Sequence, residues 1–298
     1  LIAEYHDSST RARAMSIHQT SYYVGVIVSG FLAGFIADRL GWQYSFLIFG
    51  AAGVLFTFVL IWRLKDKNPV GKEVANAAEK KPSLLEAMGA IFKVPTAVCM
   101  IFGFTSLIFV LTGYLTWMPK YLKEAFELSS ASAGFNSMFW THAAAFVGVL
   151  VAGGLSDKIA AAKGGGKNRL VLQAGGLLLA APCIMLMGLS ENLMIVYAAL
   201  AGFGFFRAFF DANTYAVLYD VTPPRLHASC ASVMGMTGFA VGSLAPVILG
   251  ALKQSMGSLS SAFPILAVIW VVCGVLMFVS ANIFYKRDRE RVRMNTNK

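Results

Sequence analysis

Charged residues are scarce in this sequence. Aspartate, glutamate, lysine and arginine make up 13% of its 298 residues, whereas soluble domains carry about 25%. This deficit excludes most soluble folds and disordered chains, because both expose a polar surface. The net charge of +10 does not indicate nucleic-acid binding, because the basic residues lie in short breaks between long apolar runs. We therefore expect no nucleic-acid partner.

The patterns of catalytic and metal sites are missing as well. The four cysteines (Cys99, Cys183, Cys230 and Cys273) all lie in apolar stretches, without the CxxC or Cys/His spacing of a metal site. The sequence contains neither HExxH nor GxSxG, and residues 161–168 match a phosphate-binding loop poorly, with Ala161 at the first glycine position. We expect no enzyme activity, no cofactor and no bound metal.

Long apolar stretches dominate what is present. Hydrophobic residues make up 57% of the chain and the mean hydropathy is +0.65. A helix that crosses a bilayer needs about 20 mostly apolar residues. Eight stretches meet this requirement, and together they predict an all-α polytopic membrane protein with eight transmembrane helices, at roughly 17–37, 44–63, 97–117, 135–155, 170–189, 194–218, 229–252 and 262–285.

The loops between these stretches differ in basic charge from one side to the other. One side carries only Arg39, Lys120, Lys123 and Lys253, whereas 20 lysines and arginines lie on the opposite side. The positive-inside rule makes the basic side cytoplasmic, and both termini belong to it. We expect an integral, multi-pass protein of the plasma (inner) membrane, with the lipid bilayer as its surroundings.

One polar segment divides the chain. Residues 64–93 form a cytoplasmic central linker, which leaves two spans in residues 1–63 and six in residues 94–298. The end of the linker predicts a short amphipathic helix capped by Ser83, with Glu86 at the matching position of a capping box. Transporters are often built from two six-span halves joined in this way.

Four features resemble the major facilitator superfamily, and they cover essentially the whole chain. The resemblance rests on residues 11–16 before a glycine-rich span with residues 38–46 after it, on the central linker, on the loop 153–158 with 167–169, and on the loop 220–228. It implies spans five to twelve of a twelve-helix fold, of which residues 1–63 are the last two helices of the first half. Because the sequence begins at Leu1 rather than methionine, we expect a fragment.

The same resemblance implies an alternating-access mechanism with a conformational latch on the cytoplasmic side. The family uses an aspartate and basic residues of the loop motifs for this purpose. An insertion of glycine-rich sequence around residues 159–166 departs from the family pattern and leaves the strength of the latch open. The latch candidates are Asp157, Lys158, Arg169, Asp220 and Arg225.

Arg207 is the clearest candidate for a substrate site, because an ionisable residue at bilayer depth needs a partner or a function. Asp211 follows at i+4 on the same helix face, and Thr214 continues the stripe. Arginine suits carboxylate or phosphate groups, and Asp211 can neutralise it or take up a coupling proton. A purely structural ion pair remains an equal alternative.

Further polar residues in the spans are candidates for substrate binding or coupling. His142 suits a proton relay, but a histidine bonded to a backbone carbonyl is the more common case. Tyr114 fits either an aromatic belt at the membrane boundary or a substrate contact. Gln19 and Tyr22 share a helix face and serve either binding or helix packing.

The combined expectation is a secondary active transporter of a small organic anion, such as a sugar acid or carboxylate, with a proton or Na⁺ as coupling ion. Sugar-phosphate exchangers of the family carry a histidine in the fifth span where Tyr22 stands in His18-Gln19-Thr20-Ser21-Tyr22, which counts against that alternative. A non-transporting membrane sensor of the same fold is the second alternative.

Overall fold

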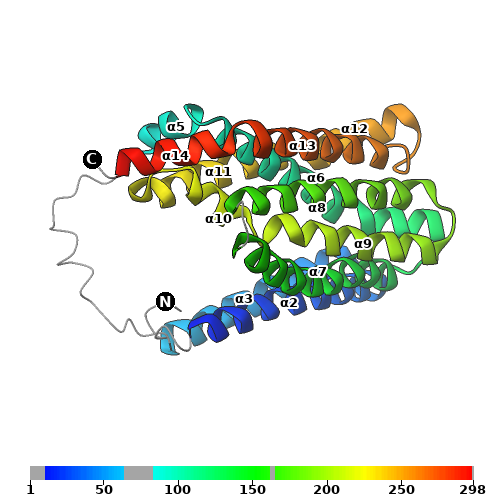
Figure 1. Ribbon diagram of the computed structural model, residues 1–298. Helices are drawn as coiled ribbons and strands as arrows, with labels where there is room; N and C mark the ends of the chain where they lie inside the picture. Colours follow the sequence, from blue (N-terminus) through cyan, green and yellow to red (C-terminus); the bar gives the residue numbers. More distant parts are fainter. Residues whose placement is uncertain (1–10, 64–82, 162–164, 297–298) are drawn as a thin grey trace.

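A computed structural model describes residues 11–63, 83–161 and 165–296 (Figure 1). These residues form helices joined by short loops, and the described part contains no β-strand. The helices are α2 (Arg11–Leu40), α3 (Trp42–Arg63), α5 (Leu84–Phe92), α6 (Pro95–Phe126), α7 (Ser130–Ala161), α8 (Gly166–Leu189), α9 (Leu193–Asp211), α10 (Thr214–Asp220), η1 (Pro224–Leu226), α11 (His227–Gly242), α12 (Ala245–Met256), α13 (Phe263–Ile283) and α14 (Tyr285–Thr296).

Eight helical segments of the described part are long and apolar enough to cross a membrane. They coincide with the eight predicted stretches, so the all-α fold with eight spans is confirmed. The central linker is described only from residue 83 onward, and the rest of that predicted segment lies outside the described residues. The division of the chain into 1–63, 64–93 and 94–298 stays a prediction.

Two of the predicted spans are broken, which the sequence analysis did not foresee. The stretch 194–218, expected as one helix, is interrupted at Ala212 and Asn213 between α9 and α10. The stretch 229–252 is interrupted at Ser243 and Leu244 between α11 and α12, where Pro246 lies in the first turn of α12. A proline is tolerated at that position because the amide hydrogen it lacks has no partner within the helix.

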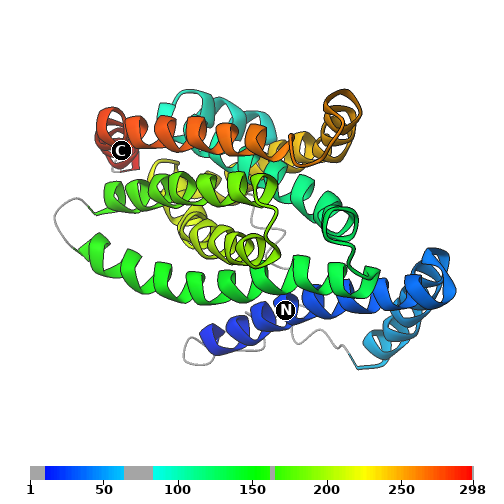
Figure 2. The ribbon, with the colours of Figure 1, turned by 90° about the vertical axis from the view of Figure 1, so that its right-hand side faces the viewer.

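The helices from α6 to α13 form one bundle, and α2 lies along one side of it against α7 (Figure 2). Glycines allow this close approach. A Cβ on Gly30 would lie 2.7 Å from the carbonyl oxygen of Gly134, and one on Gly34 would overlap the backbone of Ser130. Helix α3 contacts α2 and leaves most of its apolar side chains exposed.

The two ends of the bundle differ in character. At one end Gly41, with φ of +100°, turns the chain between α2 and α3, and the Asp38 carboxylate accepts hydrogen bonds from the Ser130 and Ala131 amides at the start of α7. The opposite end carries α5 and α14 (Figure 1). We call it the basic end, because Lys93, Arg225 and the arginine-rich helix α14 lie there.

The predicted cap of α5 is confirmed, but its capping box is wrong. The Ser83 hydroxyl accepts a hydrogen bond from the Leu85 amide. Glu86 instead forms an ion pair with Arg225, which follows Pro223 and Pro224 in the loop after α10. The Glu86 carboxylate thus binds the positively charged guanidinium of Arg225 instead of the Ser83 amide, the local partner that the capping box predicts.

Candidate functional site

Arg207 and Asp211 form the ion pair that their spacing predicts. An Nη1 atom of Arg207 lies 3.0 Å from Oδ2 of Asp211, one turn further along α9. The Arg207 side chain is 7% exposed and that of Asp211 26%, so the pair is open to its surroundings from the aspartate side. Within the described part of the chain, the buried Nε of Arg207 has no hydrogen-bond acceptor. A buried donor without an acceptor is uncommon and calls for an explanation.

Two other predicted residues lie close to this pair. Tyr114 of α6 is buried, lies with its ring centroid 5.3 Å from that of Phe203 of α9 at an interplanar angle of 48°, and hydrogen-bonds to Thr141 of α7 at 2.7 Å. Arg207 lies close enough to both Tyr114 and His142 for its positive charge to interact with them electrostatically. We call Tyr114, Thr141, His142, Arg207 and Asp211 the midspan cluster.

The tyrosine and histidine of the midspan cluster are held by the backbone of α7. The Tyr114 hydroxyl donates to the Ser137 carbonyl, and Nδ1 of His142 lies 2.9 Å from the Met138 carbonyl, one turn earlier in its own helix. The aromatic-belt interpretation of Tyr114 is wrong, because the side chain is buried between helices rather than exposed to lipid. His142 adopts the common backbone-bonded arrangement.

The break between α9 and α10 follows directly after Asp211. Side chains bind backbone carbonyls beside the break. The Gln173 amide of α8 donates to the Phe210 carbonyl at 3.2 Å, and Nδ2 of Asn213 donates to the Phe209 carbonyl. The Ser156 hydroxyl of α7 donates to Oδ1 of Asn213. Interrupted helices of this kind are typical of binding sites in transporters.

Gln173, Asn213 and Ser156 are site residues that the sequence analysis missed. Gln173 is fully buried, and in the described structure its Oε1 has no hydrogen-bond donor. A glutamine inside the apolar stretch 170–189 was a signal for such a role, because a buried amide needs partners. Asn213 is a residue that favours turns, and this preference was the available signal for the break.

The remaining substrate candidates are Thr214, Tyr22 and Gln19. Thr214 begins α10, and its hydroxyl is bound to the Phe210 carbonyl at 2.9 Å. Tyr22 is 55% exposed, and its neighbour Tyr23 is the residue that faces His142, with 6.0 Å between ring centroids. Gln19 lies in α2, but its side chain is outside the described residues.

The latch candidates do not come together as one group. The Asp220 carboxylate at the end of α10 accepts a hydrogen bond from the Tyr285 hydroxyl at 2.7 Å, and the charge of Arg169 acts on the same tyrosine. Gly166, at the start of α8, touches this pair so closely that a Cβ would overlap both polar atoms. We call Gly166, Arg169, Asp220 and Tyr285 the basic-end cluster.

Two of the other latch candidates, Lys158 and Arg225, are exposed. Arg225 binds Glu86 of α5, Lys158 is exposed, and the side chain of Asp157 is not among the described residues. The pKa of Tyr285 is raised above that of an ordinary tyrosine. Burial is the main cause, and the hydrogen bond to Asp220 and the negative charge of Asp220 add to it. The tyrosine therefore acts as a neutral donor to a carboxylate at neutral pH.

The sequence and fold match known proteins. The family model of the Major Facilitator Superfamily matches residues 1–246. The chain belongs to this superfamily. Together with its eight apolar helices, this membership makes it a multi-pass membrane protein. Among solved structures, a bacterial homologue of the human lysosomal transporter Spinster, in an inward-facing and unoccupied conformation, is similar with a TM-score of 0.62 at 20% identity, covering 98% of this chain and 74% of that one.

Curated relatives cover the chain at low identity. The "Probable galactarate/D-glucarate transporter GudP" of Escherichia coli (strain K12) is 23% identical, over 99% of this chain and 68% of its own length. The "Hexuronate transporter" of Bacillus subtilis (strain 168) is 24% identical, over 88% of this chain and 63% of its own length. The chain thus spans about two thirds of the length of these relatives. They are named as transporters rather than enzymes, as the sequence analysis expected.

Proposed function

We propose that the protein is a secondary active transporter of a small organic anion, with a sugar acid as the substrate class. The observation that carries the proposal is the midspan arginine, Arg207, which is buried and keeps one donor without an acceptor in the described structure. The relatives named for galactarate, glucarate and hexuronate transport support the same class of substrate. All of these substrates carry carboxylates.

The chemistry of the pair suits reversible binding of a carboxylate. A guanidinium group presents several donors in one plane and binds carboxylates through two of them. In the absence of substrate, Asp211 balances the charge of Arg207, which avoids an uncompensated charge at bilayer depth. A substrate carboxylate competes with Asp211 for the same donors, so that Arg207 keeps an anionic partner while Asp211 is displaced.

The aspartate also offers a route to ion coupling. When a substrate carboxylate displaces Asp211 from Arg207, the aspartate loses the charge that stabilises its ionised form, and protonation becomes more favourable. Proton uptake then accompanies substrate binding. Na⁺ is the alternative coupling ion, and the two are distinguished by which ion gradient drives uptake.

The orientation and the gating follow from the family mechanism. We place the basic end in the cytoplasm and the protein in the plasma (inner) membrane, because positively charged loops are retained on the cytoplasmic side. In the alternating-access scheme, the two halves of a transporter rock around a midplane site. The bond between Asp220 and Tyr285 belongs to the cytoplasmic side of that movement and stabilises one of its states.

Uptake of radiolabelled D-glucarate tests the proposal in cells that lack their own sugar-acid transporters and express the complete reading frame. We expect accumulation that unlabelled galactarate reduces and D-glucose does not, and that disappears in Arg207→Ala. Arg207→Lys keeps the charge but not the planar group, and we expect it to retain a small part of the uptake. Unchanged uptake by Arg207→Ala would contradict the assignment of the site.

The sensor alternative predicts a different result in the same cells. A sensor binds D-glucarate without concentrating it, so purified protein shows a thermal shift with the ligand while cells accumulate none. For a transporter, a protonophore abolishes accumulation if protons are coupled, whereas replacement of Na⁺ by K⁺ abolishes it if Na⁺ is coupled. Each result assigns one component of the mechanism.

A further inference from the structure

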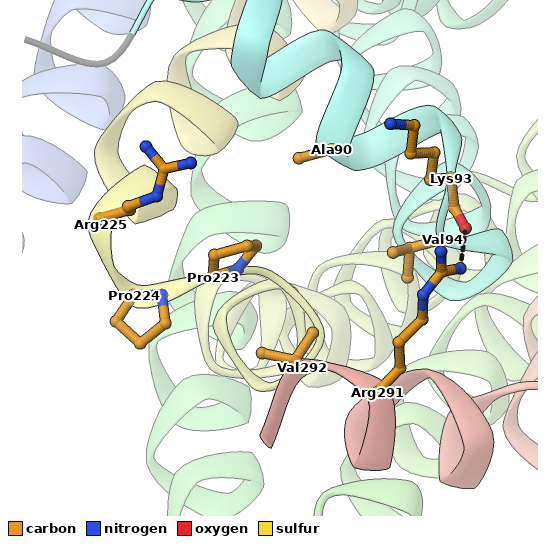
Figure 3. A pocket seen from close by; sticks show the side chains of 8 residues that line it. All are labelled: Ala90, Lys93, Val94, Pro223, Pro224, Arg225, Arg291 and Val292. Carbon is orange, nitrogen blue, oxygen red and sulfur yellow. Dashed lines mark hydrogen bonds between the residues drawn. The ribbon is translucent and has the colours of Figure 1, made fainter. Parts of the chain in front are cut away.

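We propose that a hollow at the basic end binds the headgroup of an anionic phospholipid. The hollow has a volume of about 540 Å³ and lies between α5, the loop after α10, and α14. Lys93, Arg225 and Arg291 supply three positive charges to its lining, and Pro223, Pro224 and Val94 supply apolar wall. Figure 3 shows Lys93 and Arg291 on one side of the hollow and Arg225 on the opposite side.

The charges in the hollow favour an anion. None of its described lining residues is acidic. Glu86 pairs with Arg225, so the carboxylate offsets one of the three cations and leaves the other two. An Nη1 atom of Arg291 lies 3.4 Å from the Lys93 carbonyl, which fixes the guanidinium beside the lysine. Two neighbouring positive charges attract a phosphate diester, which carries one negative charge.

One acidic residue of α14, Asp288, is directed away from the hollow. Asp288 is buried, and its Oδ2 accepts bonds from the amide and hydroxyl of Thr96 at the start of α6. This contact ties α14 to the membrane-spanning bundle and keeps its carboxylate occupied. The same helix therefore presents Arg291 to the hollow while its buried aspartate holds the helix in place.

The opposite side of α5 suits an acyl chain. Met88 and Phe92 line a second hollow, also of about 540 Å³, which runs along α6 between α11 and α13 and is almost entirely apolar. Phe92 and Lys93 are consecutive residues, and each lines one of the two hollows. Leu85 and Phe92 of α5 are 78% and 67% exposed. A ligand with an anionic head and an apolar tail fits this arrangement, whereas a free anion uses only half of it.

Phospholipid is the occupant because the hollow lies at a membrane boundary. Helix α5 precedes the span of α6, and α14 follows the span of α13, so the headgroup region of a bilayer reaches both helices. Basic pockets between membrane helices on the cytoplasmic side are known places for anionic headgroups. The proposal does not depend on the transported substrate, because none of the midspan residues lines the hollow.

Native mass spectrometry of the purified complete protein tests this site with dioleoylphosphatidylglycerol and dioleoylphosphatidylcholine. We expect tighter binding of phosphatidylglycerol. Lys93→Gln combined with Arg291→Gln should weaken it by about 30-fold, because each basic residue at an anionic membrane surface contributes about 1 kcal/mol. The matched control, Lys286→Gln with Arg63→Gln, also removes one lysine and one arginine, but from exposed positions outside the hollow. It should leave binding unchanged.

Further variants separate the possible outcomes. Lys93→Arg with Arg291→Lys keeps both charges and should bind phosphatidylglycerol almost as tightly as the parent protein, which separates a charge effect from a folding defect. Equal losses in the Gln pair and in its control would overturn the proposal, since they indicate a general surface effect. Displacement of phosphatidylglycerol by millimolar inorganic phosphate would also overturn it, because the occupant is then a free anion.

Discussion

The midspan cluster and the Asp220–Tyr285 pair of the basic-end cluster are both polar groups inside an apolar protein, yet they satisfy their hydrogen bonds differently. In the basic-end cluster, Asp220 and Tyr285 bind each other, and Gly166 closes over them. In and beside the midspan cluster, Nε of Arg207 and Oε1 of Gln173 are buried and have no partner within the described residues.

This difference separates polar groups that stabilise a structure from groups that are available to a ligand. A buried polar atom without a partner costs roughly 1–3 kcal/mol, so a protein keeps one only where another requirement maintains it. The Asp220–Tyr285 hydrogen bond of the basic-end cluster carries no such cost and links α10 to α14. Under the proposed function, the Nε donor of Arg207 and the Oε1 acceptor of Gln173 serve the carboxylates and hydroxyls of a sugar acid.

The largest effect is expected from breaking the ion pair of the midspan cluster. Arg207→Ala leaves Asp211 at bilayer depth without its partner, and we expect a loss of about 3 kcal/mol in the free energy of unfolding, the lower end of the range for buried pairs, because Asp211 is partly exposed. Thermal unfolding of the purified protein in detergent measures this loss.

The double variant Arg207→Ala/Asp211→Ala separates stability from transport. Removing both charges should recover most of the lost stability, since no uncompensated charge remains, while uptake stays abolished. If the double variant regains uptake as well, the pair is structural and the substrate binds elsewhere. This outcome favours the structural alternative that the sequence analysis left open.

The next largest effect is expected from overfilling the basic-end cluster. Gly166→Ala places a methyl group against the Tyr285 hydroxyl and the Asp220 carboxylate, and we expect a loss of about 2 kcal/mol from overpacking. Gly175→Ala is the matched control in the same helix, because no neighbouring atom lies within 4 Å of the point that its methyl group would occupy. It should be neutral or slightly stabilising, because alanine favours helix.

Membrane spans and local spacings could be predicted from the sequence because both depend on neighbouring residues. The eight apolar stretches, the Ser83 cap and the i+4 pairing of Arg207 with Asp211 all required only short-range regularity. The number of residues needed to cross a bilayer and the pitch of a helix are fixed, so the corresponding predictions transferred directly to the structure.

Contacts between distant segments could not be predicted in this way. The partner of Glu86 is Arg225, 139 residues away, and the neighbour of His142 is Tyr23 rather than Tyr22. Both depend on how one helix is rotated against another, and a single sequence does not encode this rotation in its periodicity. The break after Asp211 escaped notice because the stretch 194–218 is long enough for one span, and the single turn-favouring residue Asn213 did not outweigh its overall apolar character.

A smaller effect is expected at the edge of the midspan cluster. Gln173→Leu removes the bond to the Phe210 carbonyl but also removes the unpartnered Oε1, so we expect the free energy of unfolding to change by less than about 1 kcal/mol. D-glucarate uptake should nevertheless fall about tenfold, because the variant loses one hydrogen bond to the substrate. Such a bond contributes about 1.4 kcal/mol, which corresponds to a factor of ten.

The control for this prediction is Gln254→Leu, an exposed position of α12 at the other end of the bundle. It makes the same chemical change away from both clusters and should alter neither stability nor uptake. A large loss of stability in Gln173→Leu with normal uptake would show that Gln173 only stabilises the helix break and does not contact the substrate.

The smallest effect concerns the proton of Tyr285. Its pKa is raised in the folded protein, first by burial and then by Asp220, so the neutral hydroxyl is favoured in the fold relative to the unfolded chain. The stability that this preference contributes is fully present below the unfolded tyrosine pKa of about 10 and is lost as the pH rises above it.

Tyr285→Phe removes this dependence together with the bond to Asp220. We therefore expect the variant to melt slightly below the parent protein at pH 8 and the difference to shrink by pH 11. A constant difference across this range would mean that the tyrosine ionises as readily in the folded protein as in the unfolded one.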